Sequence, residues 1–311
     1  MSLDPRVKRF LSILAAGNPP NALQTSAAER RTAFAELLTL GAAELPIGRT
    51  EDHKVPGPAG PLPVRIYTPA GASARLMPGI VYFHGGGLVA GTIATHESIA
   101  RALANSGACR VVSVDYRLAP EHPFPAALED SLAAIRHIGA NAADFGIDPA
   151  RFGICGDSAG ATLAAASCHA LARTGGPQLA LQLLLCPILD HSRMTESRRE
   201  FATGYLVDQA TLDHDLLHYL LPGANPADPR ISPLRAEDLS GLPRTIIHTA
   251  QFDPVRDEGL EYCERLRAAG VSVSYVCHPG MIHLFYGLGQ VIPYARTAFV
   301  EIGAQIREAL A

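Results

Sequence analysis

Short apolar segments alternate with longer helical patterns from about residue 62 to the C-terminus of this 311-residue chain. Several segments, such as 80–83 and 183–185, are continuously apolar, which is typical of strands covered on both faces in a parallel sheet. This alternation predicts a doubly wound α/β sheet with a ligand site at the carboxyl ends of its strands. The predicted strands are 64–67, 80–83, 110–114, 152–155, 181–186, 245–249 and 272–277, and the predicted helices between them are 96–106, 126–140, 159–173, 258–269 and 294–310.

Two regions of the chain interrupt this alternation. Residues 5–17 and 26–40 carry apolar residues at helical spacing before the first predicted strand. Residues 190–225 hold a charged stretch, a helical pattern at 211–221 and a turn rich in Pro, Gly and Asn. An insertion of this length in a compact domain is usually a lid or a binding element, and the alternative is a surface excursion without a role.

The composition of the chain favours a small molecule as its partner. A formal net charge of -4 gives neither the basic footprint of a nucleic-acid-binding protein nor a polybasic surface for anionic lipid. No stretch approaches the roughly 20 apolar residues of a membrane span, so we expect a cytoplasmic protein without stable membrane association. The cysteines lack the tight spacing of a zinc site, so we expect no metal and interpret them as reduced, buried side chains. They are Cys109, Cys155, Cys168, Cys186, Cys263 and Cys277.

The sequence Gly-Asp-Ser-Ala-Gly at residues 156–160 lies between a predicted strand and an Ala-rich predicted helix. A nucleophile needs its hydroxyl exposed at a strained turn from strand to helix, and glycines two residues to either side relieve the crowding there. The helix N-terminus also favours developing negative charge. The motif alone is weak, but this context predicts that Ser158 is a nucleophile.

A run of three glycines, Gly85, Gly86 and Gly87, follows His84 at the end of the predicted strand 80–83. Glycines allow backbone N–H groups to approach a ligand closely. In lipases and esterases such a run supplies oxyanion-hole donors, together with the residue after the nucleophile, here Ala159. The alternatives are a plain turn or a phosphate-binding loop, and the latter lacks its Gly-Lys-Ser/Thr ending. His84 is expected to orient the loop through hydrogen bonds.

A hydroxyl nucleophile needs a base, and the base needs an orienting acid. In this type of fold the chain order is Ser, then Asp or Glu, then His. His278 and His283 both follow the last predicted strand, and we favour His283 because His278 is too near the strand end. Asp253 is the first carboxylate after the strand 245–249, and we favour it over Asp257, which is expected in the first turn of the next helix.

Five segments together resemble the hormone-sensitive lipase family, also called the bacterial family IV esterases, in its branch with the Gly-Asp-Ser-Ala-Gly motif. They occur in family order, at 84–87, 115–127, 156–160, 253–259 and 280–283. The resemblance implies an α/β-hydrolase fold and assigns nucleophile, acid and base to Ser158, Asp253 and His283. It also implies an oxyanion hole from Gly85, Gly86, Gly87 and Ala159.

The resemblance further implies a helical cap over the site. We expect cap helices in 1–45, the first part of the catalytic core in 46–189, a cap insertion in 190–225 and the second part of the core in 226–311. Departures from the family pattern, such as Leu88 where many relatives have Trp and Leu284 in place of Gly, affect the shape of the substrate pocket. The residues expected in this pocket are Leu88, Asp157, Leu206 and Leu284.

The activity implied by the resemblance is that of a carboxylesterase for short- to medium-chain acyl esters, acting through a covalent acyl-enzyme without metal or cofactor. Activity is expected to fall at acidic pH, because protonated His283 cannot accept the serine proton. Many relatives are dimers, so we expect a homodimer. The alternatives are a catalytically silent binding protein with this fold, or a hydrolase of amides, carbamates or lactones.

Overall fold

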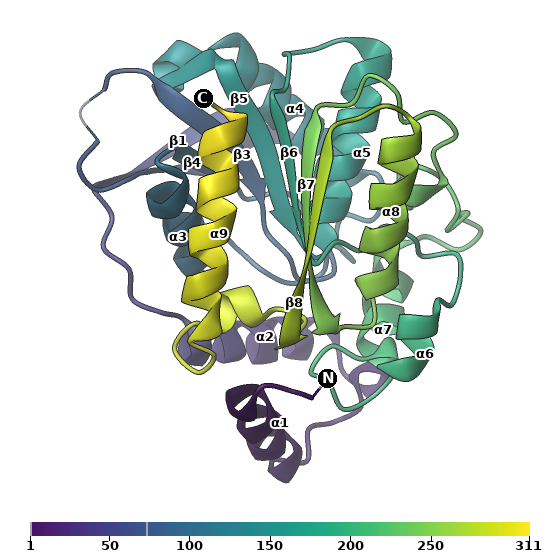
Figure 1. Ribbon diagram of the computed structural model, residues 1–311. Helices are drawn as coiled ribbons and strands as arrows, with labels where there is room; N and C mark the ends of the chain where they lie inside the picture. The colour runs from purple at the N-terminus through teal and green to yellow at the C-terminus, as the bar shows by residue number, and fades with distance from the viewer. Residues whose placement is uncertain (1, 73) are drawn as a thin grey trace.

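An eight-stranded sheet forms the centre of the computed structural model, which describes residues 2–72 and 74–311 (Figure 1). The strand order is β1-β2-β4-β3-β5-β6-β7-β8, with antiparallel pairing of β2 to β1 and to β4 and parallel pairing elsewhere. The strands are β1 (Arg49–Gly57), β2 (Gly60–Thr68), β3 (Met77–Phe83), β4 (Arg110–Val114), β5 (Ile147–Asp157), β6 (Leu181–Leu185), β7 (Arg244–Phe252) and β8 (Val273–Ile282). This architecture confirms the predicted α/β class.

Each face of the sheet carries its own layer of helices, which explains why the central strands are continuously apolar. Along β3, Ile80 and Tyr82 face one hydrophobic cluster, whereas Val81 and Phe83 face the other. The first cluster packs against α3 (Glu97–Gly107) and α9 (Tyr294–Ala309). The second packs against α4 (Ala126–Ala140), α5 (Ala159–Thr174) and α8 (Arg256–Ala268) (Figure 1).

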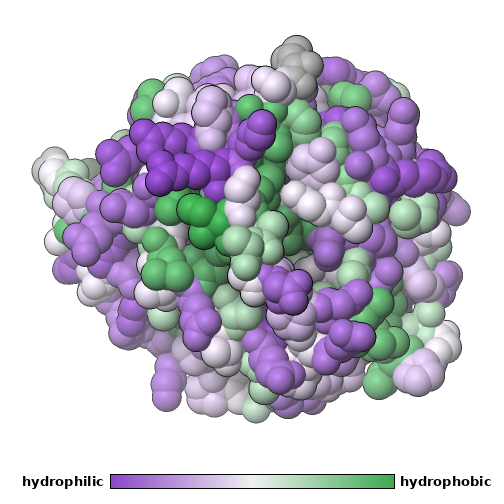
Figure 2. Space-filling view, turned by 90° about the horizontal axis from the view of Figure 1, so that it is seen from below, coloured by the Kyte–Doolittle hydropathy of each residue, from purple (hydrophilic) through white to green (hydrophobic). Residues whose placement is uncertain are grey.

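The remaining α-helices lie together at the carboxyl end of the parallel strands (Figure 1). They are α1 (Pro5–Ala16), α2 (Ala27–Gly41), α6 (Glu196–Glu200) and α7 (Gln209–Tyr219). Arg31 holds α2 to the core, because its guanidinium donates to the carboxylate of Glu121 and to the carbonyl oxygens of Val89 and Ala119. Figure 2 views this end and shows apolar surface gathered near its centre, within a polar surround.

Short 3₁₀-helices complete the connections. They are η1 (Ala22–Gln24), η2 (Ala142–Phe145), η3 (Pro233–Arg235) and η4 (Phe285–Leu288). No helix within residues 2–72 and 74–311 is long and apolar enough to span a membrane.

Several elements differ from the sequence-based expectation; β5, for example, begins at Ile147 and not at residue 152. Strand β1 was not predicted, because it is an antiparallel edge strand in which only Val55 is buried. Helix α6 was not predicted either, because five charged and polar residues give too short a pattern. Strand β8 continues to Ile282 and does not end at residue 277. The division into four segments stays a prediction, with α1 and α2 in its first segment and α6 and α7 in its third.

Candidate active site

Ser158 occupies a sharp turn between β5 and α5. Its backbone has φ 54° and ψ -124°, a conformation that costs energy for a residue other than glycine. A Cβ at Gly160 would overlap the carbonyl oxygens of Phe83 and His84, so only glycine allows α5 to begin this close to the end of β3. This is the local geometry of a nucleophile elbow, which pushes the hydroxyl out of the turn.

The side chains of Asp253 and His283 meet Ser158 above the strand ends. Asp253 follows β7 and His283 follows β8 directly. The Nε2 atom of His283 lies 2.9 Å from Ser158 Oγ, and its Nδ1 atom lies 2.8 Å from Asp253 Oδ2. The other Asp253 oxygen accepts a hydrogen bond of 3.0 Å from the backbone N–H of Val255, which fixes the carboxylate. The arrangement can move a proton from the serine hydroxyl to a ring that a carboxylate orients.

The electrostatics of His283 suit a base. Burial lowers the pKa of its ring, but the charge of Asp253 and the hydrogen bond to it raise the pKa, and the net result is a pKa above the ordinary value. The ring therefore holds a proton more readily than free imidazole does, although it is 2% exposed.

The two rejected candidates lie in other networks. His278 is inside β8, where its Nε2 atom contacts His248 Nδ1 at 2.9 Å and its Nδ1 atom contacts the Tyr294 hydroxyl at 3.2 Å. Burial lowers the pKa of His278 to about 3. Asp257, at the start of α8, accepts a hydrogen bond of 2.8 Å from the backbone N–H of Ser197, which lies in α6.

The predicted oxyanion donors are not equivalent. The N–H of Gly85 donates to Asp157 Oδ1 at 2.9 Å, so it is not free for a ligand, and this contradicts the prediction for Gly85. Gly86 and Gly87 have φ values of 115° and 68°, and their N–H groups make no hydrogen bond within the described residues. The N–H of Ala159, at the first position of α5, has no partner there either. These three groups remain as candidate donors.

Asp157 supports the oxyanion loop, and its place in a substrate pocket stays a prediction. Its buried carboxylate accepts a hydrogen bond of 2.5 Å from the Tyr82 hydroxyl, besides the one from Gly85. The sequence motif gave its position but not its orientation. His84 helps hold the same loop, since its Nδ1 donates to Gly85 O at 2.8 Å and its ring stacks on Tyr116 at 4.4 Å between centroids.

Of the other residues predicted for the pocket, Leu88 lines a cavity beside the elbow, whereas the places of Leu206 and Leu284 in the pocket stay predictions. This cavity is narrow, about 10 Å³, and Gly87 and Ala159 also line it. Leu284 belongs to a small apolar cluster with Phe34 and Leu38 of α2, and Leu206 packs against this cluster and against the one under α3 and α9. The remaining lining of the cavity was not predicted, because it comes mostly from α7. It consists of Ile188, His191, Leu212, Asp215, Leu216 and Tyr219.

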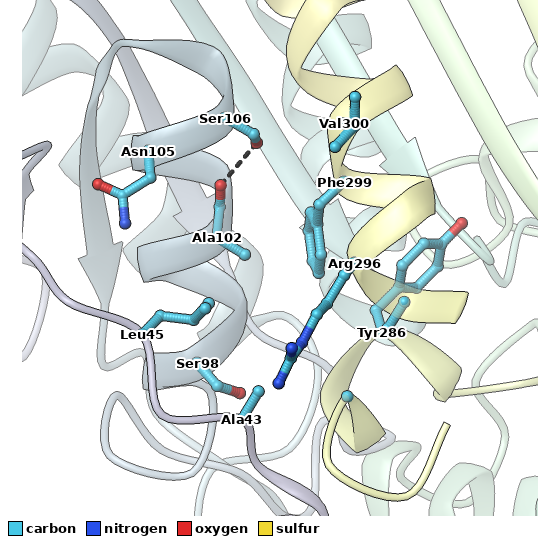
Figure 3. Close-up of a pocket in the computed structure, with 12 residues that line it drawn as sticks. Ala43, Leu45, Ser98, Ala102, Asn105, Ser106, Tyr286, Arg296, Phe299 and Val300 are labelled. Carbon is cyan, nitrogen blue, oxygen red and sulfur yellow. Dashed lines mark hydrogen bonds between the residues drawn. The ribbon is translucent and has the colours of Figure 1, made fainter. Parts of the chain in front are cut away.

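A larger cavity of about 360 Å³ lies away from this chemistry, between α3 and α9 (Figure 3). Ala102, Phe299 and Arg296 are among its lining residues, and none of the three residues around the elbow hydroxyl takes part. Its apolar walls and single guanidinium offer no nucleophile beside a base.

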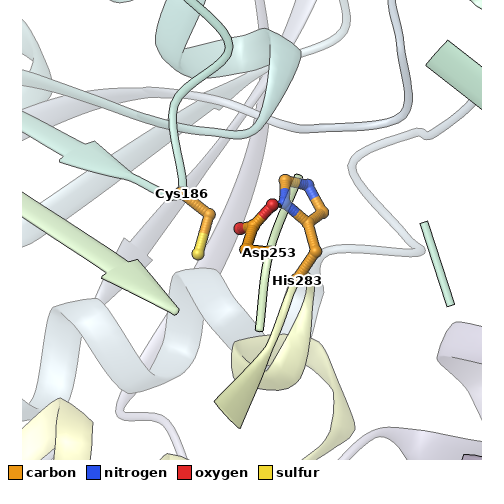
Figure 4. A group of neighbouring side chains, drawn as sticks. All are labelled: Cys186, Asp253 and His283. Carbon is orange, nitrogen blue, oxygen red and sulfur yellow. Dashed lines mark hydrogen bonds and ion pairs between the residues drawn. The ribbon is translucent and has the colours of Figure 1, made fainter. Parts of the chain in front are cut away.

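Cys186 lies beside the acid and the base (Figure 4). The ligand atoms of Cys186, Asp253 and His283 all lie within 4.8 Å of one another, and by residue type they could coordinate a divalent metal. Both ring nitrogens of His283 are already hydrogen-bonded, however, so a metal ion on Nδ1 would displace the bond that orients the ring. The cluster therefore fits proton transfer better than metal binding.

Comparison with known proteins places this geometry in context. A family profile described as alpha/beta hydrolase fold matches residues 80–287. The carboxylic ester hydrolase LipN of Mycobacterium tuberculosis is 44% identical over 247 residues, which cover 77% of this chain but only 65% of LipN, less than two thirds of its length. The arylesterase of Saccharolobus solfataricus is 36% identical over 309 residues, which cover 99% of both chains. The solved structure of an ester hydrolase from the metagenome of Lake Arreo has a TM-score of 0.96 at 40% identity and covers 98% of both chains.

Proposed function

The chain belongs to the hormone-sensitive lipase family, the bacterial family IV esterases, and is a carboxylic ester hydrolase; we propose that it cleaves short- to medium-chain acyl esters with Ser158 as nucleophile, His283 as base and Asp253 as orienting acid. One observation carries the assignment: the His283 ring is within hydrogen-bond distance of Ser158 and of Asp253 at the same time. A protein that only bound a ligand would not need this alignment.

The proposed reaction has two halves. Ser158 Oγ attacks the ester carbonyl carbon while His283 Nε2 takes the hydroxyl proton, and the negative charge that forms on the carbonyl oxygen is held by N–H groups of Gly86, Gly87 and Ala159. The tetrahedral intermediate collapses, the bond to the alcohol oxygen breaks, and His283 gives that oxygen its proton. Water then attacks the acyl carbon while His283 takes one of its protons. The bond from that carbon to Ser158 Oγ breaks, His283 returns the proton to Oγ, and the acid leaves.

The proposal is tested with p-nitrophenyl butyrate and two serine variants. Ser158→Ala removes the nucleophile and should lower kcat by about 10³-fold or more. Ser240→Ala changes an exposed serine in a loop and should retain wild-type activity. Equal background release by wild type and Ser158→Ala would instead support a catalytically silent binding protein. A higher kcat/KM on an amide, carbamate or lactone than on p-nitrophenyl butyrate would contradict the proposed substrate class.

We also propose that the protein is cytoplasmic and forms a homodimer. All six cysteines are free thiols, which suits a reducing compartment. The dimer rests on the family resemblance alone. Light scattering of the purified protein should give twice the mass of the chain, and a monomer at micromolar concentration would contradict the dimer. Cell fractionation tests the location.

A further inference from the structure

A buried carboxylate from the cap lies directly beside the oxyanion loop. Asp215, on α7, is 5% exposed and lines the narrow cavity that Gly87 and Ala159 also line. A Cβ at Gly87 would overlap the Asp215 carboxylate, so only glycine leaves room for it. A negative charge next to N–H groups that hold an oxyanion would oppose the charge developing there, unless a cation balances it.

Arg30, on α2, balances that charge. Its Nη2 atom lies 3.1 Å from Asp215 Oδ2 and its Nε atom lies 3.3 Å from Oδ1, the paired geometry that a guanidinium makes with a carboxylate. Little of either side chain is exposed, 14% for Arg30 and 7% for Asp215, so solvent screens the pair weakly. His214 adds a contact of 3.0 Å to Asp215 Oδ1. The ion pair therefore ties together two cap helices that are far apart in sequence.

The cavity beside this ion pair is too small for a long chain. Its volume of about 10 Å³ is what a single water molecule requires. Leu212, Leu216 and Tyr219 of α7 line it, together with Ala159 of the elbow. In the two-step reaction the acyl group stays attached to the enzyme after the first half, whereas the alcohol must leave and water must enter. A small cavity beside the nucleophile suits the group that stays.

We propose that the Arg30–Asp215 ion pair latches α7 against α2 as a wall of the acyl cavity, so that an acyl group enters only as far as α7 yields and the shortest acyl groups are favoured. This inference rests on the proposed function and deepens it by naming the acyl class. Releasing the latch lets α7 move away from the oxyanion loop and lengthens the cavity.

The test compares kcat/KM for p-nitrophenyl octanoate and p-nitrophenyl acetate in wild type and variants. Arg30→Met removes the guanidinium but keeps an apolar stem, and Asp215→Ala removes the carboxylate from the wall. Leu216→Ala enlarges the cavity without changing charge. Each should raise the octanoate-to-acetate ratio by about tenfold or more. The ratio does not depend on how much of a variant is folded, because misfolded protein lowers both rates equally.

Glu121→Gln is the matched control. It removes the ion pair that Arg31 makes from α2 to the core, away from the cavity, and Glu121 is largely exposed. Its ratio should stay within about twofold of wild type.

Four results would overturn the inference. The first is an unchanged ratio in both latch variants, and the second is a wild type that prefers octanoate. The third is a change in kcat/KM that the variants show only for acetate esters of longer alcohols, because the cavity would then bind the alcohol group and not the acyl group. In these three cases the proposed function stands if Ser158→Ala is inactive on the acetate. The fourth is no hydrolysis of any ester by wild type, which overturns both proposals.

Discussion

At the residue scale, the protonation of His283 depends on two opposing effects. Burial lowers the pKa of the ring, whereas the Asp253 carboxylate raises it above the ordinary value. Where no carboxylate is in contact, burial is the largest effect: it lowers the pKa of His278 to about 3, with a smaller contribution from His248, and that of His248 to about 4, against the hydrogen bond to Gln305. One carboxylate at the end of β7 therefore separates a base from structural histidines that stay neutral.

The pH dependence of hydrolysis follows from this difference. Because the pKa of His283 is raised, the ring is protonated at a higher pH than free imidazole, and protonated His283 cannot accept the Ser158 proton. We expect kcat/KM on p-nitrophenyl butyrate to fall on acidification with an apparent pKa above about 6.5. Asp253→Asn should lower kcat by about 10⁴ and move that apparent pKa down. The carboxylate of Asp257 does not contact His283, so Asp257→Asn should keep the wild-type pH profile. A wild-type rate that is flat from about pH 5 to pH 8 would contradict the assignment of His283 as the base.

Asp157 offers a second prediction at this scale, because it acts through the oxyanion loop. Asp157→Ala leaves the Gly85 N–H and the Tyr82 hydroxyl buried without an acceptor, at a cost of about 1–3 kcal/mol for each group. We expect a fall in kcat of about 10- to 100-fold with a smaller change in KM, since the loop would no longer hold its donors in place. Asp157→Asn keeps an acceptor oxygen and should lose less. An equal loss of kcat in both variants, or none in either, would contradict the role.

The meeting of Ser158, Asp253 and His283 could be predicted from sequence because each belongs to a local pattern. Ser158 lies in a strand-turn-helix motif, and Asp253 and His283 come shortly after predicted strands. The orientation of Asp157 could not be predicted, since it depends on the tertiary contact of β5 with Tyr82 on β3. The place of Asp215 beside Gly87 depends likewise on how α7 packs, which no local pattern encodes.

At the element scale, the site exists because parallel strands end at the same edge of the sheet. Elements with a complete apolar pattern matched their predicted bounds, as in β4 (Arg110–Val114) and α4 (Ala126–Ala140). Elements that polar contacts hold in position did not match a prediction, and α6 is the clearest case. Its Arg198 donates to Glu258 of α8 at 2.7 Å, and this pair is buried between the insertion and the core.

The buried ion pair gives a prediction about stability. Glu258 also accepts hydrogen bonds from the backbone of Leu189 at 2.7 Å and of Asp190 at 2.9 Å, so it anchors the start of the insertion. Arg198→Met leaves this carboxylate buried and unpaired and should lower the free energy of unfolding by about 3–5 kcal/mol in urea denaturation. Adding Glu258→Gln removes the charge but keeps an acceptor, so the double variant should recover part of the loss.

The exposed pair Arg244–Glu308, at 2.8 Å, provides the control. Arg244→Met should change the free energy of unfolding by less than about 0.5 kcal/mol. A double variant of Arg198 and Glu258 that is less stable than Arg198→Met alone would show that the unpaired charge is not the source of the loss.

At the scale of the whole molecule, packing helices on both faces of the sheet and across its carboxyl end removes many histidines from water. Burial lowers the pKa of six of them to about 3 or about 4. These are His84, His96, His169, His191, His248 and His278. The folded protein therefore keeps these rings neutral across the range in which an unfolded chain would protonate them, near about 6.5.

This difference predicts that the fold loses stability on mild acidification. Below about pH 6.5 the unfolded chain binds more protons than the folded one, so each such histidine contributes a loss of up to about 1.4 kcal/mol per pH unit. Four groups with raised pKa values oppose the loss, namely His214, His283, Asp157 and Glu258, but they are fewer. The urea concentration at the unfolding midpoint should decrease as the pH is lowered from about 7 to about 5. His169→Gln should make this decrease smaller, whereas His122→Gln, at an exposed position, should not. A midpoint that rises over the same range would mean that the raised groups dominate, and that burial of neutral histidines does not set the acid limit of this fold.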